Sequence, residues 1–104
     1  MSLVGLDFSD ALRAIRQGDR VTRAGWNGKG MWITLSPGKV VKVSEMWSPA
    51  NRDLARRRGG EAVVRAYLTM KTVDDEIVPW LPSQSDVLAQ DWRIYNDPPE
   101  KEDV

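Results

Sequence analysis

The sequence predicts a small α+β domain in which antiparallel β-hairpins combine with an N-terminal helix and one or two short helices. One observation is the helical spacing of apolar residues within residues 8–18. Another is the pair of turn motifs Asn27-Gly28 and Asp74-Asp75, each lying between runs rich in β-branched or aromatic residues. Because domains typically span about 100–150 residues, a chain of 104 residues fits one domain, which we place at residues 1–95.

The N-terminal helix is predicted by the segment LDFSDALRAIRQG. Its apolar residues fall at i, i+3, i+4 and i+7, namely Phe8, Ala11, Leu12 and Ile15. Asp7 is a suitable N-cap, and Gly18 follows the last turn. This spacing predicts one buried face.

Two hairpins are predicted. The first spans residues 20–35, with the returning strand at 31–35, because Asn and Gly tolerate the positive φ of a type I′ turn. The second begins with a long strand at 61–72, turns at Asp74-Asp75 and returns through 76–78. Its pairing is expected to end at Pro79, which has no N–H to donate.

Between the hairpins, a β-branched strand is predicted at 39–43, followed by a basic insertion at 48–60. In the insertion, Ser48 is an N-cap, Pro49 occupies the first helical position, and a helix at 50–58 ends at Gly59-Gly60. We find no internal repeat.

After the second hairpin, a short helix is predicted at 84–90 behind a capping box of Ser83 and Asp86. A last strand follows at 92–95. The acidic, Pro-rich tail at 96–104 is expected to be disordered.

Composition limits the chemistry. Lys and Arg number 15, as do Asp and Glu, so the net charge is zero, and there is no Cys or His. The usual general base and the commonest metal ligand are therefore missing, and we expect no enzyme, no catalytic residue, no cofactor and no metal site. The N-terminus lacks the features of a signal peptide, and no run approaches the ~18 apolar residues of a membrane span. We expect a cytoplasmic protein that binds neither membrane nor nucleic acid polymer.

The segment Trp26-Asn27-Gly28-Lys29-Gly30-Met31-Trp32 is the first candidate binding site. It is consistent with a hairpin whose tryptophans pack on the core. It could also bind a ligand, because a base could stack on Trp26 beside the soft Met31. Asn27 could then read a base edge or ribose, while Lys29 and the glycine amides, Gly28 among them, would donate hydrogen bonds. Five Trp against two Tyr and one Phe favour ligand or subunit contacts for some of them.

The segment from Trp80 to Asp86 is the second candidate. Prolines on both sides of Trp80 restrict the backbone, so the indole could be a rigid ligand contact or a core corner. The helix start at Ser83 and Gln84 could receive an anion. Asp86 could cap the helix or accept from a ribose hydroxyl.

Two charged clusters leave alternatives open. The arginines of the insertion could form a solvated face or contact phosphate or a partner: Arg52, Arg56, Arg57 and Arg58. The acids Asp74, Asp75 and Glu76 could be metal ligands or an acid–base pair, although adjacent acids of this kind are typical of a turn.

Four fragments in order resemble one family: F-x-x-A-L-x-x-I-x-x-G, R-x-G-W-N-G-K-G-M-W, L-x-M-K-T and I-V-P-W-L-P-S-Q-S-D-V-L-A-x-D-W. From about Phe8 to Ile94 the chain is similar to the Thoeris anti-defence proteins of the second type, small phage and prophage proteins. It departs from them in the basic insertion and the acidic tail.

The resemblance implies a sponge that binds, without cleaving, a cyclic-nucleotide immune signal. The signal would be glycocyclic ADP-ribose or a cyclic di- or trinucleotide, as in Thoeris and CBASS defence. It also implies a homotetramer with pockets near subunit interfaces, in the cytosol of a host bacterium. Two rival functions remain: a metal-dependent hydrolase of the same signal using Asp74, Asp75 or Asp91, and a nucleic-acid-binding or phage-structural adaptor.

Overall fold

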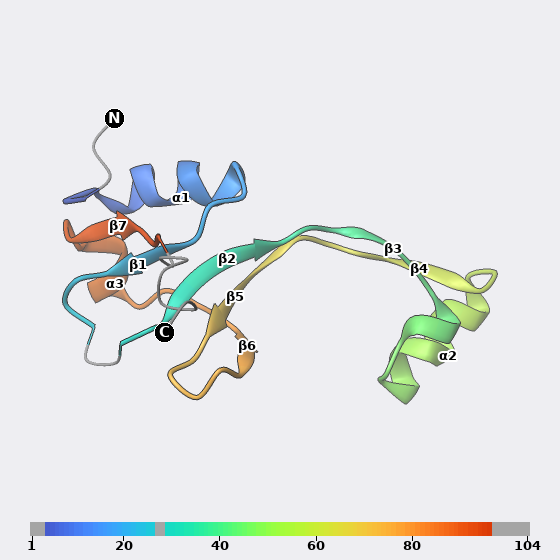
Figure 1. The fold of residues 1–104 in the computed structure, drawn as a ribbon. Coiled ribbons are helices and arrows are strands. Elements are labelled where there is room, and N and C mark those ends of the chain that lie inside the picture. Colours follow the sequence, from blue (N-terminus) through green and yellow to red (C-terminus); the bar gives the residue numbers. More distant parts are fainter. Residues whose placement is uncertain (1–3, 27–28, 97–104) are drawn as a thin grey trace. The chain divides into compact units, whose positions relative to one another are not determined.

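The structure is a computed structural model that describes residues 4–26 and 29–96 (Figure 1). Its helices are α1 (Phe8–Arg16), the 3-10 turn η1 (Val43–Glu45), α2 (Pro49–Arg57) and α3 (Gln84–Leu88). Its strands are β1 (Val21–Arg23), β2 (Trp32–Ser36), β3 (Lys39–Lys42), β4 (Glu61–Val64), β5 (Tyr67–Lys71), β6 (Ile77–Pro79) and β7 (Trp92–Ile94). The predicted α+β class with antiparallel sheets is confirmed. Within the described residues, no helix is long and apolar enough to cross a membrane.

The chain divides into two compact units. Unit 1 combines residues 1–35 with 68–104, and unit 2 consists of residues 36–67. The predicted insertion at 48–60 lies within unit 2. The predicted tail at 96–104 lies, apart from Asn96, outside the described residues.

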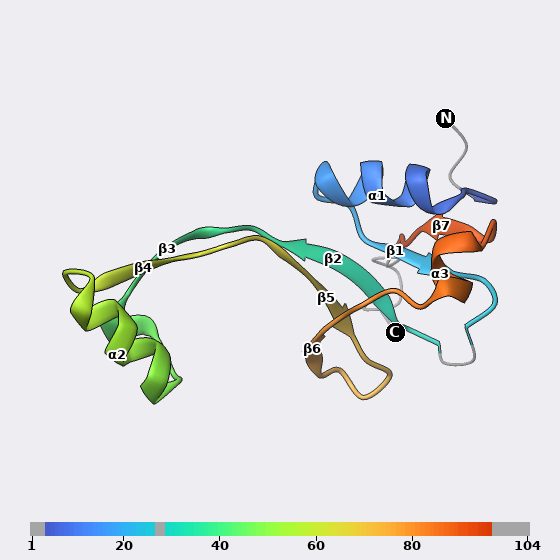
Figure 2. The same ribbon diagram turned by 180° about the vertical axis from the view of Figure 1, so that it is seen from behind.

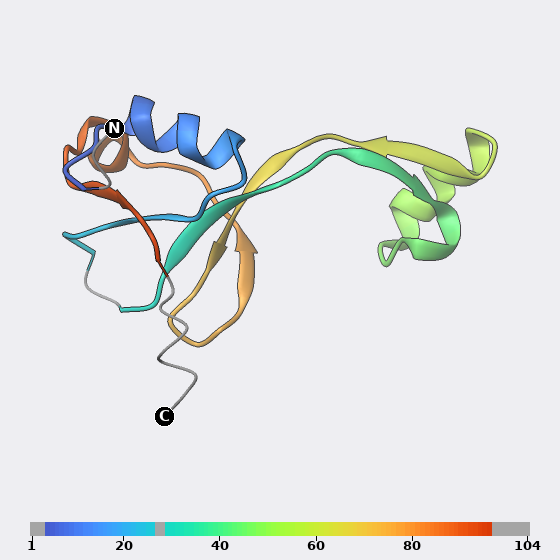
Figure 3. The ribbon, with the colours of Figure 1, turned by 45° about the horizontal axis from the view of Figure 1, so that its top comes forward.

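Unit 1 contains the five-stranded sheet in the order β6-β5-β2-β1-β7 (Figure 3). Along β1, Val21 is paired with Ile33 of β2 and with Ile94 of β7. Arg23 at the end of β1 lies opposite Trp92. The first and the last strand of the chain, β1 and β7, are therefore neighbours at one edge of the sheet.

Helix α1 covers the β1–β7 side of the sheet, as Figure 2 also shows from behind. Asp7 caps it by accepting from the N–H of Asp10 at 2.8 Å, as predicted. Its buried residues pack with strand residues in one core: Leu6, Ala11, Ala14, Ile15, Val21, Ile33 and Trp92. Because side chains alternate along strands, Val21, Ile33 and Ile94 belong to the sheet face toward α1. The opposite face of β1 and β7 therefore carries Thr22 and Arg93.

For the second predicted hairpin, the turn at Asp74-Asp75 and the strand pairing across it are confirmed. β5 and β6 pair from Lys71–Ile77 to Thr69–Pro79. Asp75 in the turn has a φ of 64°. The strand ends at Pro79 as expected, although one further hydrogen bond joins the N–H of Trp80 to the carbonyl of Leu68 at 3.0 Å.

Unit 2 is a two-stranded ribbon of β3 and β4 with α2 between them in the chain. Ser48 caps α2 through Asn51, and the helix ends before Gly59 and Gly60, whose φ values are 89° and 103°. This part of the prediction is correct.

The predicted long strand at 61–72 is wrong, because β4 and β5 are separate strands in different sheets. The break at Arg65-Ala66 lies beside Pro37 and Gly38. Pro37 has no N–H for a ladder, and a Cβ on Gly38 would lie 2.8 Å from the backbone nitrogen of Ala66.

Two smaller corrections concern the bounds of helices and strands. Helix α3 ends at Leu88, two residues before the predicted end at 90. β1 begins at Val21 and β2 at Trp32, so both strands of the hairpin predicted at 20–35 begin one residue later than expected, and the pairing of Val21 with Ile33 confirms the hairpin itself. Asn27 and Gly28 themselves lie outside the described residues.

Candidate functional site

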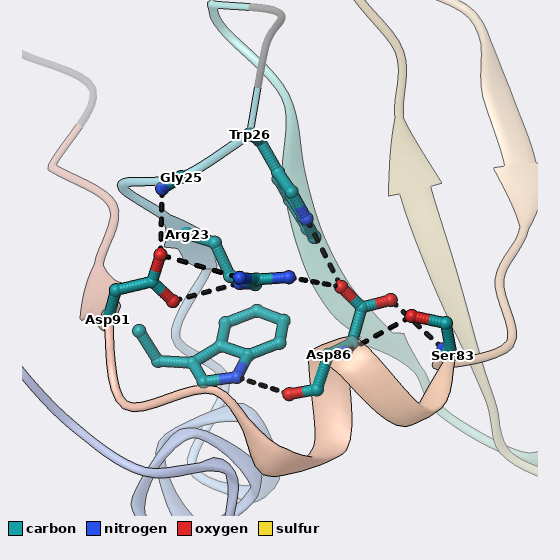
Figure 4. Close-up of polar contacts among 7 residues, drawn as sticks. Arg23, Gly25, Trp26, Ser83, Asp86 and Asp91 are labelled. Atoms are coloured by element: carbon teal, nitrogen blue, oxygen red, sulfur yellow. Dashed lines mark hydrogen bonds and ion pairs between the residues drawn. The ribbon is translucent and has the colours of Figure 1, made fainter.

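Arg23 at the end of β1 binds two acids that lie 63 and 68 residues later in the sequence (Figure 4). Its Nη1 donates to Asp86 Oδ1 of α3 at 2.8 Å, and its Nε donates to Asp91 Oδ1 at 2.8 Å. Asp91 also accepts from the backbone N–H of Gly25 at 2.8 Å. The guanidinium is thus shared between two carboxylates, and the loop after β1 is tied to the segment before β7.

The Asp86 carboxylate accepts hydrogen bonds from three different residues. Asp86 is 8% exposed. Besides Arg23, its carboxylate accepts from Trp26 Nε1 at 3.2 Å and from the backbone N–H of Ser83 at 3.0 Å. Ser83 Oγ accepts from the Asp86 N–H at 3.1 Å, which completes the predicted capping box. One carboxylate therefore caps α3 and orients the indole of Trp26.

The aromatic rings pack around the same carboxylate. Trp26 meets Trp92 edge-on with ring centroids 5.4 Å apart, and it meets Trp80 at 6.4 Å. Phe8 of α1 lies 5.5 Å from Trp92. The indole N–H of Trp92 donates to the backbone carbonyl of Asp86 at 2.9 Å. The two tryptophan motifs of the sequence thus form one cluster.

These contacts shift three pKa values. Burial alone would raise the pKa of Asp86, but hydrogen bonds from Ser83, Arg23 and Trp26 outweigh it and hold the pKa below its ordinary value. The Arg23 hydrogen bond, with help from the Gly25 N–H, lowers the pKa of Asp91. The same bond to Asp91 raises the pKa of Arg23. All three groups are charged at neutral pH.

A pocket of about 390 Å³ adjoins this cluster. It is lined by residues of β1, of the following loop, and of β7 and the position after it: Thr22, Arg23, Ala24, Trp26, Lys29, Gly30, Arg93 and Tyr95. Small-molecule sites typically have volumes of about 300–1,000 Å³. Lys29 and Arg93 are both exposed and supply positive charge beside two aromatic rings. Such a lining suits an anion that also carries a flat ring.

Further aromatic surface lies close to this pocket. The guanidinium of Arg20 is 5.4 Å from the ring centroids of both Trp32 and Tyr95. The two rings are themselves 6.4 Å apart. Cation–π contacts of this kind restrict the movement of the rings. The Tyr95 ring that lines the pocket is therefore held in place by Arg20.

Comparison with known proteins identifies the family. Residues 6–95 match the sequence profile of the Thoeris anti-defense 2-like domain. A protein of Bacillus phage SP01 named Thoeris anti-defense 2 is 36% identical over 91 residues, which are 88% of this chain and 96% of the phage protein. The chain belongs to the Thoeris anti-defense 2 family. The predicted resemblance and the phage anti-defence role are confirmed.

In this Thoeris anti-defense 2 family member, the predicted site residues fall into three groups. Trp26 and Lys29 line the 390 Å³ pocket. Trp80, Ser83 and Asp86 belong to the aromatic and carboxylate cluster. Two further residues belong to neither set: Met31 is half-buried before β2, and Gln84 is exposed at the first position of α3. Asn27 and Gly28 are outside the residues that the structure describes.

The three acids considered for hydrolysis differ in exposure and in hydrogen bonding. Asp74 and Asp75 are exposed in the β5–β6 turn, and Asp91 is engaged by Arg23 and Gly25. In the described part of the chain, no three His, Cys, Asp or Glu residues gather in a way that could hold a metal ion.

Sequence reasoning missed Thr22, Arg23, Arg93 and Tyr95 as pocket residues. Thr22 and Arg93 are direct cross-strand partners, and no local pattern indicates that β1 pairs with the last strand. Alternation within W-R-I-Y could have placed Arg93 and Tyr95 on one sheet face, but only the pairing of β1 with β7 brings them beside Thr22.

Proposed function

We propose that this protein binds and sequesters, without cleaving, a cyclic-nucleotide immune signal, and thereby prevents activation of the bacterial immune effector. The supporting observation is the pocket in which Lys29 and Arg93 lie beside Trp26 and Tyr95. Glycocyclic ADP-ribose and cyclic di- or trinucleotides all combine phosphate with a base. Two cations and two rings at one pocket match that combination.

Tight binding of the signal requires contacts to its base as well as contacts to its phosphate. A sponge that competes with a receptor at nanomolar concentration needs about −12 kcal/mol of binding free energy. Stacking contributes about 1–3 kcal/mol per base. Hydrogen bonds to charged groups contribute about 1.5–3 kcal/mol each. Phosphate contacts through Lys29 and Arg93, with loop amides such as that of Gly30, are needed in addition to the rings.

The proposal includes a homo-oligomer, most simply a tetramer, acting in the cytosol of the host bacterium. Large apolar side chains of the described chain are exposed, among them Leu81 at 89% and Leu88 at 76%. Exposed apolar surface of this kind is typical of protein–protein contacts. Sedimentation of the protein at micromolar concentration tests this part, and a monomer would contradict it.

The decisive experiment separates a sponge from a hydrolase. The protein is incubated with glycocyclic ADP-ribose, or with a panel of cyclic di- and trinucleotides, then denatured by heat, and the supernatant is analysed by mass spectrometry. Quantitative release of an intact ligand that had been depleted from solution supports sequestration. Linear products that accumulate with time, and disappear when a chelator is added, would instead support the metal-dependent hydrolase.

A further inference from the structure

Unit 2 is strongly basic although the whole chain is neutral. Residues 36–67 contain seven Lys or Arg and three Asp or Glu, a formal net charge of +4, so the rest of the chain carries −4. The arginines of α2 and its end are all exposed: Arg52, Arg56, Arg57 and Arg58. The ion pair that the structure gives α2, within its described residues, joins Arg56 to Asp53 at 3.5 Å. Most of this charge is therefore available to a partner.

The same unit exposes apolar side chains. Trp47 is 96% exposed, and Val63 is 71% exposed. Val63 also lines a hollow of about 410 Å³ together with Val40 and Leu54, and the charged residues Arg58 and Glu61 belong to the same lining. Trp and Arg are the residues most enriched at the energetic centres of protein interfaces. This combination favours a protein partner with both apolar and acidic side chains.

The turn between β5 and β6 in unit 1 has that composition. Asp74, Asp75 and Glu76 are consecutive and exposed. Apolar residues flank them on both sides, with Val73 exposed by 51% and Ile77 by 73%. We call residues 73–78 the acidic hairpin tip. Asp75 is paired with Lys71 at 2.6 Å, which fixes the turn and leaves Asp74 and Glu76 as the acids to test.

We propose that unit 2 of one copy binds the acidic hairpin tip of a second copy. This proposal rests on the homo-oligomer named in the proposed function and assigns one of its interfaces. Charge complementarity favours a second copy because the basic and acidic surfaces belong to one neutral chain. Two copies that exchange these contacts reciprocally form a closed, symmetric pair. A nucleic acid would satisfy the arginines but would give Val63 and the apolar hollow no apolar partner.

The test is a charge swap read by sedimentation velocity at about 50 mM and 500 mM salt. Arg52→Glu with Arg56→Glu should weaken self-association at least tenfold, as should Asp74→Lys with Glu76→Lys. Placing all four substitutions in one chain restores opposite charges and should recover most of the affinity. Arg13→Glu with Arg16→Glu changes the net charge equally on exposed positions of α1 and should have little effect. Thermal melting confirms that each variant folds.

Other outcomes would overturn the assignment. A monomeric wild-type chain would remove both the homo-oligomer and this interface. An oligomer that all four variants leave intact would remove the interface alone. Weakening by Glu100→Gln with Glu102→Gln, but not by the hairpin pair, would assign the tail as the partner. Salt-dependent retardation of a single-stranded DNA oligonucleotide, lost with the arginine pair and without self-association, would assign nucleic acid. Ligand binding, measured separately by calorimetry, tests the sponge independently of all these results.

Discussion

Gly25 donates its backbone N–H to Asp91 Oδ2 at 2.8 Å, and a Cβ at position 25 would lie 2.7 Å from that same oxygen. The loop after β1 therefore approaches the carboxylate too closely for any side chain. Asp91 cannot retreat without losing Arg23 Nε, which it binds at 2.8 Å. Glycine at this position is required by the close approach and not by a positive φ.

Gly25→Ala should therefore destabilise the protein by about 1–3 kcal/mol, the usual cost of disturbing a buried or charged hydrogen bond. The double variant with Asp91→Ala supplies the control, because removal of the carboxylate removes the clash. We expect the two changes to be non-additive in denaturant unfolding. Full additivity would mean that the added methyl group does not meet Asp91.

Acid should weaken the fold through Asp86 and Asp91. Their pKa values are lower in the folded state than the ~3.9 of an ordinary Asp. The unfolded chain therefore takes up protons first as the pH falls, and stability that is fully present above about pH 5 declines below it. Thermal melting between pH 7 and pH 3 measures this decline. Asp91→Asn should be less stable at pH 7 but should show a shallower decline, whereas an unchanged slope would contradict the linkage.

Trp26 can be tested by two substitutions that remove different contacts. Trp26→Phe keeps a ring near Trp92 and Trp80 but removes the N–H that Asp86 accepts at 3.2 Å. We expect a loss of about 1–3 kcal/mol of stability. Trp26→Ala also removes the packing and should cost up to about 3–5 kcal/mol. An unchanged melting temperature in both variants would contradict this structural role of Trp26.

Local sequence patterns predict most of the elements because caps and turns are local. Asp7, Ser48 and Ser83 each accept a hydrogen bond from an N–H three residues later in the chain, and such spacings are readable from the sequence. The β5–β6 turn at Asp74-Asp75 is readable for the same reason.

The pairing of strands depends on long-range contacts and is not readable in this way. Nothing near Arg23 indicates its two partners, which are 63 and 68 residues away in the chain. The break between β4 and β5 likewise depends on Pro37 and Gly38 across the ribbon. For the candidate site, Trp26 and Lys29 were visible in one motif, but Arg93 joined them only through the β1–β7 pairing.

The pocket itself is tested most directly by Lys29→Ala and Arg93→Ala. Both side chains are exposed, so each substitution should change the stability by less than about 0.5 kcal/mol. If Lys29 and Arg93 contact ligand phosphate, each loss should weaken binding at least tenfold in calorimetric titration, and added salt should reduce the difference because it screens exposed charges. The matched control is Arg16→Ala, which removes one positive charge at an exposed position of α1. This variant should bind the ligand like the wild type. Wild-type affinity in both pocket variants would mean that the signal is held elsewhere, whatever the outcome of the turnover assay.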